Sequence, residues 1–132
     1  MGQENKTEYW GEIPLEEMKR LNDTAEEIGW QKAIVQLLNK DLQQTLLDGR
    51  RADWKYLAPL DVSAAEVLDI GSGLGAVSFS LAKTCRKVYA LEPVPERLRF
   101  IEIRARQDGI RNIEPVCADA SRLPFPDRSF DL

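Results

Sequence analysis

The sequence contains no histidine and only two cysteines, and these scarcities narrow the chemistry that it can carry. Histidine is the commonest metal ligand and the commonest general base, so we expect neither a zinc site nor a serine–histidine pair. Cys85 and Cys117 lie far apart in the sequence, and two thiols make neither a disulfide framework nor a zinc site. We therefore predict that both are ordinary semi-buried residues and that the chain holds no metal.

Long apolar runs are also missing. No segment approaches the ~20 apolar residues that a membrane span needs, and the polar start of the chain has no signal-peptide core. The net charge is −4, which argues against a nucleic-acid partner because such binders are more often basic. With 132 residues, 43% hydrophobic and 30% charged, the chain suits one globular domain, and we predict a cytoplasmic protein without a membrane span.

The character of the chain changes near Asp61. We predict an N-terminal helical segment over residues 1–60 and an α/β domain over residues 61–132. In the first part, a proline in the first turn and capping-box spacing at Thr24 mark two helix starts. The helices predicted for this part span about 14–21, 24–38, 41–47 and 51–57.

The second part alternates strands with helices, which implies a Rossmann-like parallel sheet with right-handed crossovers. Pro115 cannot donate to a strand ladder, so the third strand should lie at the sheet edge, which gives the strand order 3-2-1. The predicted strands span about 66–70, 87–91 and 112–117, and the predicted helices span about 75–85 and 95–107.

The last residues, 129–132, have the composition expected of the beginning of a fourth strand. No helix or cap follows them, so we expect the chain to be an N-terminal fragment with a truncated sheet. The outer edge of the first strand would then be open, and an open edge invites self-association.

The segment Asp69–Gly75, of sequence DIGSGLG, joins the first strand to the following helix. Gly71, Gly73 and Ala76 satisfy a dinucleotide-binding pattern, in which a tight turn lets the backbone approach a nucleotide-like ligand. Alone this signal is weak, because three small residues also occur in plain tight turns.

Two further acids strengthen the signal. Glu92 ends the second strand, where an acidic side chain takes a ribose diol, and Asp119 follows the third strand. With Asp69 they place three carboxylates at three successive strand ends, the edge at which open α/β sheets bind ligands. Each acid alone could be a solvated loop residue, but their joint placement favours a binding site.

The charge of Asp69 separates two cofactor classes. A nicotinamide dinucleotide would lay its pyrophosphate over the turn, and a carboxylate at about 4 Å would oppose it by about 4 kcal/mol at an effective dielectric of about 20. S-adenosylmethionine has no phosphate and carries two cationic groups, so the three acids suit it better. A nicotinamide-dependent oxidoreductase domain and a non-catalytic interaction module stay open as alternatives.

Residues 64–132 resemble class I S-adenosylmethionine-dependent methyltransferases. The likeness rests on four segments, and the last is common among the small-molecule enzymes of that family. These segments are Val67–Gly75, Ala90–Pro93, Cys117–Ala120 and Leu123–Leu132. In addition, the stretch Arg50–Lys55 resembles methyltransferase domains attached to glycosyltransferases of polysaccharide synthesis.

The resemblance implies a site for S-adenosylmethionine or S-adenosylhomocysteine. The glycine turn would meet the methionine part of the cofactor, and Asp69 would support its ammonium group. Glu92 would bind both ribose hydroxyls, and Pro93 would pack on the adenine. Asp119 would accept a hydrogen bond from the adenine amino group, and the Ala120 backbone would contact the ring edge. Trp54 or Lys55 would reach the methionine carboxylate. The cofactor-binding residues implied are Asp69, Gly71, Ser72, Gly73, Gly75, Glu92, Pro93, Asp119 and Ala120.

The resemblance also implies methyl transfer to a small-molecule or saccharide-related acceptor, with proximity as the main catalytic term. No catalytic residue is identified. In the family the acceptor site is built largely after the fourth strand, so we expect this chain alone to be inactive. Five arginines in and just after the 95–107 helix could suggest nucleic-acid contact, but they are more simply a solvated face. They are Arg97, Arg99, Arg104, Arg106 and Arg111.

Overall fold

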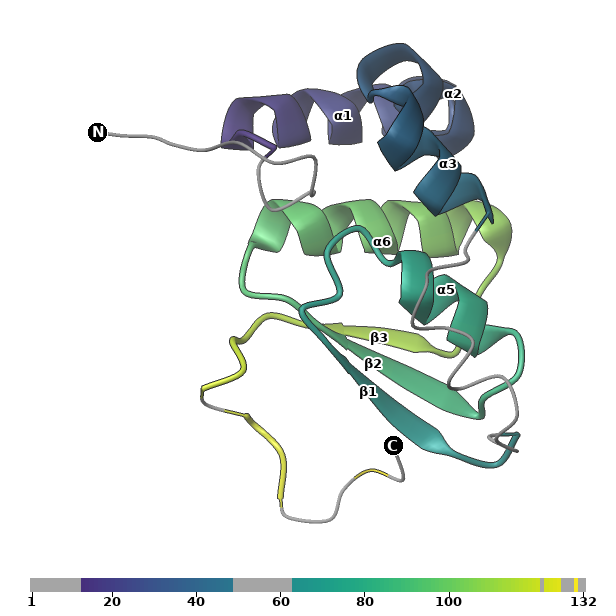
Figure 1. Cartoon of the computed structure of the whole chain (residues 1–132), viewed down its shortest axis with the longest axis vertical. Helices are drawn as coiled ribbons and strands as arrows, with labels where there is room; N and C mark the ends of the chain where they lie inside the picture. Colours follow the sequence, from purple (N-terminus) through teal and green to yellow (C-terminus); the bar gives the residue numbers. More distant parts are fainter. Residues whose placement is uncertain (1–12, 49–62, 122, 127–129, 131–132) are drawn as a thin grey trace.

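The computed structural model describes residues 13–48, 63–121, 123–126 and 130 (Figure 1). The predictions for Trp54 and Lys55, for the helix over 51–57 and, apart from Phe130, for the fourth strand lie outside these residues. The elements are α1 (Leu15–Ile28), α2 (Trp30–Leu37), α3 (Lys40–Asp48), β1 (Glu66–Ile70), α5 (Ala76–Ala82), β2 (Lys87–Leu91), α6 (Pro95–Asp108) and β3 (Ile113–Val116).

The three strands form a parallel sheet in the order β1-β2-β3, which confirms the predicted order. Ile70 pairs with Leu91 in the register of β1 and β2, and Leu91 pairs with Val116 in that of β2 and β3. The strands therefore end together, and the residues that follow them share one edge. Pro115 lies in β3, which pairs only with β2 in the described chain, as its missing N–H requires.

The N-terminal helices divide at Gly29, so the predicted helix start at Thr24 is wrong. Thr24 lies inside α1, whereas Gly29 has φ 97° and ψ 149° and separates α1 from α2. Gln107 of α6 spans this break: its side-chain amide donates to the Ala25 carbonyl at 2.8 Å and accepts the Trp30 N–H at 2.9 Å. The partner comes from a distant segment, so local spacing could not reveal it.

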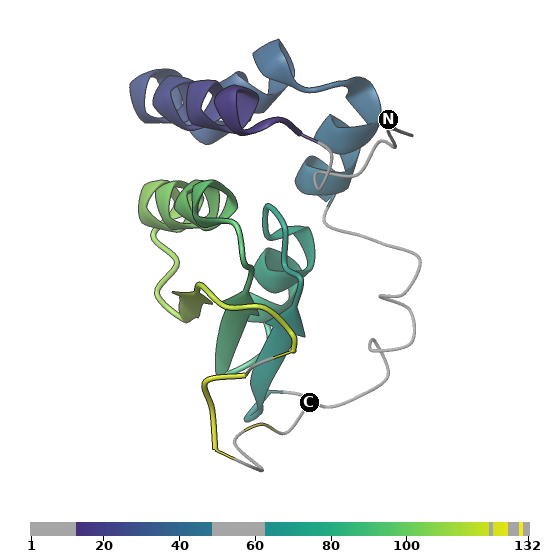
Figure 2. The same cartoon turned by 90° about the vertical axis from the view of Figure 1, so that its left-hand side faces the viewer.

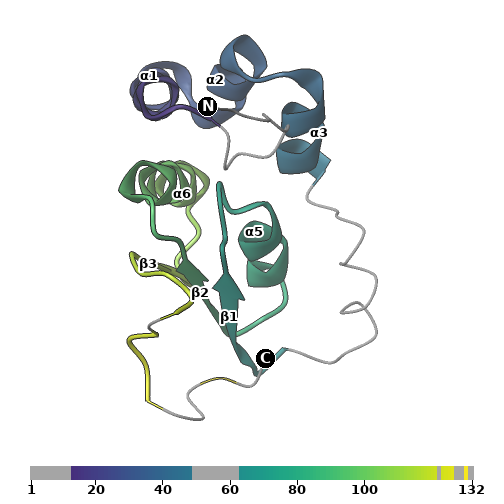
Figure 3. The same ribbon diagram turned by 60° about the vertical axis from the view of Figure 1, so that its left-hand side comes forward.

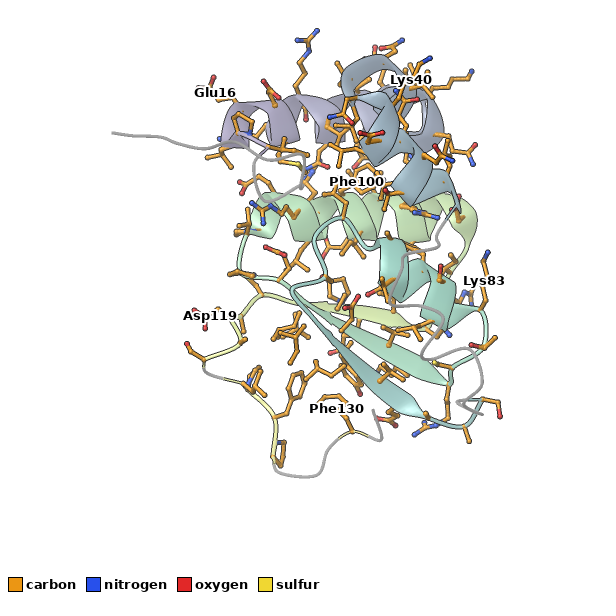
Figure 4. The ribbon with its side chains drawn as sticks, viewed as in Figure 1. Glu16, Lys40, Lys83, Phe100, Asp119 and Phe130 are labelled. Atoms are coloured by element: carbon orange, nitrogen blue, oxygen red, sulfur yellow. The ribbon has the colours of Figure 1, made fainter. Side chains whose placement is uncertain are left out.

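The elements stack in layers. Figures 1 and 2 show α1 and α2 above α6, and the sheet on the other side of α5 and α6. Figure 3 shows the turn between β1 and α5 rising toward α1, and Figure 4 shows Phe100 between α6 and the N-terminal helices. One apolar cluster accordingly joins the helical segment to the turn: Met18, Leu21, Ala25, Trp30, Ala33, Ile34, Leu46, Leu74, Ala76, Phe100 and Ile103.

The opposite face of the sheet carries an aromatic cluster. Tyr89 of β2 meets Phe125 and Phe130 edge to face, with ring centroids 5.5 and 5.1 Å away. Phe125 and Phe130 also meet each other, at 4.7 Å. The segment after β3 thereby returns to cover part of this face. In the described parts of the chain, no helix is long and apolar enough to cross a membrane.

Arg104 of α6 fastens the helical layers to one another. Its guanidinium carbon lies 3.9 Å from the ring centre of Trp30 in α2 and 4.1 Å from that of Phe79 in α5. Asp108 stands 3.6 Å from its Nε and also accepts the indole N–H of Trp30 at 3.0 Å. Burial lowers the pKa of Arg104 to about 10, so the side chain stays charged at neutral pH and stacks as a cation.

We expect Arg104→Lys to lower the free energy of unfolding by about 1–2 kcal/mol, because an ammonium cannot lie flat against both rings. Urea denaturation followed by tryptophan fluorescence measures the loss. The matched control is Arg106→Lys on the same helix, whose exposed pair with Glu26 should cost less than about 0.5 kcal/mol. Equal losses in the two variants would show that stacking does not hold the layers.

Candidate functional site

The glycine turn depends on left-handed backbone at all three glycines. Gly71, Gly73 and Gly75 have φ 68°, 60° and 90°. The Ser72 N–H donates to the Leu91 carbonyl at 2.9 Å, which ties the turn to the end of β2. The backbone therefore takes a shape that side chains would oppose, at the point where the strands end.

Gly75 also faces a steric limit. A Cβ there would lie 2.9 Å from Phe79 Cε2 and 3.0 Å from Ile101 Cγ1, whereas one at Gly71 would meet nothing within 4 Å. Gly75 is thus needed for close packing between the turn, α5 and α6. Gly71 is needed only for its backbone conformation.

Glu92 is the buried acid of the site, with 2% of its surface exposed. Its Oε1 accepts the Gly73 N–H at 3.0 Å. Its Oε2 accepts the Val94 N–H at 3.2 Å and one guanidinium nitrogen of Arg97 at 3.1 Å. The carboxylate thereby joins the turn, the end of β2 and the first turn of α6.

Asp69 and its partner lie on the β1 side of the turn. The Ser78 hydroxyl of α5 donates to Asp69 Oδ2 at 2.6 Å, and Ser78 is fully buried. This bond orients the half-buried carboxylate at the end of β1. Sequence reasoning singled out Asp69 but not Ser78, which lies one turn into the helix on its inner face.

Asp119, Ala120 and Pro93 lie at the ends of β2 and β3, and all three are exposed. Figure 4 shows Asp119 on the segment after β3, away from the helical layers. The hydroxyl and the backbone N–H of Ser121 lower the pKa of Asp119, so this carboxylate is an ionised acceptor at neutral pH. Cys117, expected to be semi-buried, is exposed and donates to the Pro93 carbonyl at 3.5 Å.

The arginines of α6 correct one prediction. Arg99 and Arg106 have 54% and 60% of their side chains exposed, in line with a solvated face. Arg97 and Arg104 have only 16% and 13% exposed, so for them the prediction is wrong. Helical spacing places them away from the apolar stripe, but Arg97 turns inward to the buried Glu92, and Arg104 turns inward to the rings of Trp30 and Phe79.

The turn can accept a polar ligand. The Ser72 hydroxyl is buried and has no hydrogen-bond partner in the described part of the chain, although a buried hydroxyl gains free energy from one. Acids follow or end the three strands at the same edge of the sheet, and they fit a ligand with hydroxyl, amino and cationic groups. Among the described residues, no three His, Cys, Asp or Glu side chains cluster as metal ligands would.

Comparison with known proteins connects these features to a family. Residues 67–132 match the family model described as a methyltransferase domain. The chain is 34% identical over 100 residues to malonyl-[acyl-carrier protein] O-methyltransferase of Halorhodospira halophila, covering 74% of this chain and 31% of that protein. It is 39% identical over 90 residues to a probable ribosomal RNA small subunit methyltransferase A of Thermococcus onnurineus, covering 67% and 32%.

A solved structure supports the same family. The crystal structure of a SAM-dependent methyltransferase from Aquifex aeolicus is 25% identical and superposes with a TM-score of 0.56, covering 76% of this chain and 53% of that one. The chain spans about a third of the length of the two curated relatives.

We expect Gly75→Ala to lower the free energy of unfolding by about 3 kcal/mol, through a strained positive φ and contact with Phe79 and Ile101. Gly71→Ala carries the same kind of strain without the contact and should cost about 1 kcal/mol. Urea denaturation of both variants makes the comparison. A loss in Gly75→Ala no larger than that in Gly71→Ala would refute the steric argument.

Proposed function

We propose that this chain, which belongs to the class I S-adenosylmethionine-dependent methyltransferase family, uses the glycine turn and Glu92 to hold S-adenosylmethionine. One observation carries the proposal: the carboxylate at the end of β2 lies against the backbone of the turn, with Gly73 N–H on its Oε1. A ribose bound by this acid would have its neighbouring atoms laid over the glycines. The parallel sheet ends at the same place, which is where open α/β sheets bind their ligands.

The remaining contacts follow from position. The methionine part would lie over the turn, with its ammonium group toward Asp69. The buried Ser72 hydroxyl belongs to the same turn and would offer it a hydrogen bond. The adenine would lie between Pro93 and the segment after β3, where ionised Asp119 accepts from its amino group. Backbone groups of the turn supply donors without net charge, so the acids make the site negative overall, which suits the sulfonium and ammonium groups of the cofactor.

The bound cofactor supplies an activated methyl group, which an acceptor nucleophile takes as the carbon–sulfur bond breaks and sulfur keeps the electron pair. This chain's residues hold the donor in place, and we assign no base or acceptor contact to them. Positioning of this kind supplies the largest part of the barrier reduction for such transfers. The activity of the whole enzyme is part of the proposal, because the chain spans about a third of its curated relatives.

For the acceptor we propose a small molecule or a saccharide-related compound. The two relatives named above are a methyltransferase of an acyl-carrier-protein substrate and a probable methyltransferase of ribosomal RNA. The net charge of −4 favours a small molecule over a polyanion such as RNA. We also propose a division of the chain into an N-terminal helical segment, residues 1–60, and a cofactor domain, residues 61–132. The outer edge of β1 would offer a surface for self-association.

Ligand preference tests the cofactor class. We expect calorimetric titration to show binding of S-adenosylhomocysteine and no measurable binding of NAD, because a pyrophosphate over the turn would meet the carboxylate of Asp69. Binding of NAD alone would replace the proposal with a dinucleotide-dependent oxidoreductase. Binding of neither ligand would favour a non-catalytic module.

We expect Glu92→Gln to weaken binding of S-adenosylhomocysteine by about 2 kcal/mol, because a neutral amide loses the charge-assisted bonds to the ribose. The matched control is Glu114→Gln on β3, an exposed acid paired with Lys87, which should leave the affinity unchanged. Thermal unfolding of both variants checks that the fold is retained. An affinity that does not change in Glu92→Gln removes this residue from the site.

A further inference from the structure

The Glu92 carboxylate is fully engaged within the protein. Three donors converge on it, the N–H groups of Gly73 and Val94 and the guanidinium of Arg97, and its side chain is only 3% exposed. A carboxylate offers about four lone-pair positions. The cis-diol of a ribose donates two hydrogen bonds, so the free protein has one acceptor position too few and little access to it.

One of the three donors is a side chain, whereas the other two belong to the backbone. The N–H groups of Gly73 and Val94 belong to the backbone of the turn and of the segment that leads into α6. Arg97 instead reaches Glu92 with a long side chain from the first turn of α6, and 16% of that side chain is exposed. Rotation of this side chain would release one of the two hydrogen bonds on Oε2 and expose the carboxylate, while the Val94 N–H stays in place.

We propose that Arg97 competes with the ribose of the adenosyl cofactor for Glu92, so that cofactor binding breaks the Arg97–Glu92 ion pair. This inference rests on the proposed function and adds a residue that sets cofactor affinity. While the pair is formed, the guanidinium neutralises a buried acid that would otherwise lack a counter-charge. When the ribose enters, its two hydroxyls replace the guanidinium on the carboxylate.

Competition has a defined effect on affinity. The apparent dissociation constant equals the intrinsic constant divided by the fraction of molecules whose site is open. Removing the competitor raises that fraction and tightens binding. A residue that positions Glu92 for the cofactor would act in the opposite direction, since its loss would weaken binding, and the sign of the change therefore distinguishes the two roles.

The test is calorimetric titration of S-adenosylhomocysteine into the 132-residue chain and its Arg97→Met variant. We expect the variant to bind about fivefold tighter, because one charge-assisted bond within the protein no longer has to be broken. Its unfolding temperature without ligand should fall, while the increase on adding ligand should exceed that of the wild type. Arg97→Lys keeps the charge but not the planar guanidinium, so its affinity should lie between those of the wild type and Arg97→Met.

Arg99→Met is the matched control, since Arg99 is on the same helix but pairs with Glu26 at the exposed surface. Its affinity should equal that of the wild type. Weaker or unchanged binding by Arg97→Met overturns the competition, and Arg97→Lys decides the question if the methionine variant does not fold. In that case binding by the wild type still supports the cofactor site. A wild-type chain that takes up no S-adenosylhomocysteine overturns the proposed function itself, and this inference with it.

Discussion

The contact between Glu92 and the Gly73 N–H is the interaction on which the site depends. It joins the end of β2 to the turn that follows β1, and the same carboxylate reaches the start of α6 through the Val94 N–H. A buried charge is tolerated only where donors surround it, and here two of the three donors are backbone N–H groups of the site itself. The acid therefore has two uses, because it shapes the glycine turn and offers its oxygens to a ligand.

The helical layers hold the turn from the other side. Leu74 points from the turn into the apolar cluster of α1, α2 and α6, and it is fully buried. Arg104 lies between Trp30 and Phe79 and links α2 to α5 through α6. Packing of the N-terminal helices thus reaches the cofactor turn directly, so a change in those helices can alter the site without touching a ligand.

The arrangement of charge explains why this nucleotide-type fold suits a cationic cofactor. A dinucleotide would rest its pyrophosphate on this turn. Here Asp69 and Glu92 stand at adjoining strand ends, and each is held by donors, Ser78 for the first and Gly73, Val94 and Arg97 for the second. Two carboxylates at adjoining strand ends attract a cationic group and repel a phosphate, so the selectivity follows from Coulomb interaction.

Local sequence determined the strands, the parallel order with Pro115 at the edge, the turn and its three acids, because alternation, turn glycines and strand-end positions are all short-range patterns. Tertiary structure alone decided that Gln107 of α6 bridges the helix break at Gly29, although the glycine itself is a local signal for a break. It also decided that Arg97 turns inward to Glu92 while Arg99 faces solvent, although both share one helix. The physical reason is that a hydrogen-bond partner or counter-charge far along the chain has no signature in local spacing.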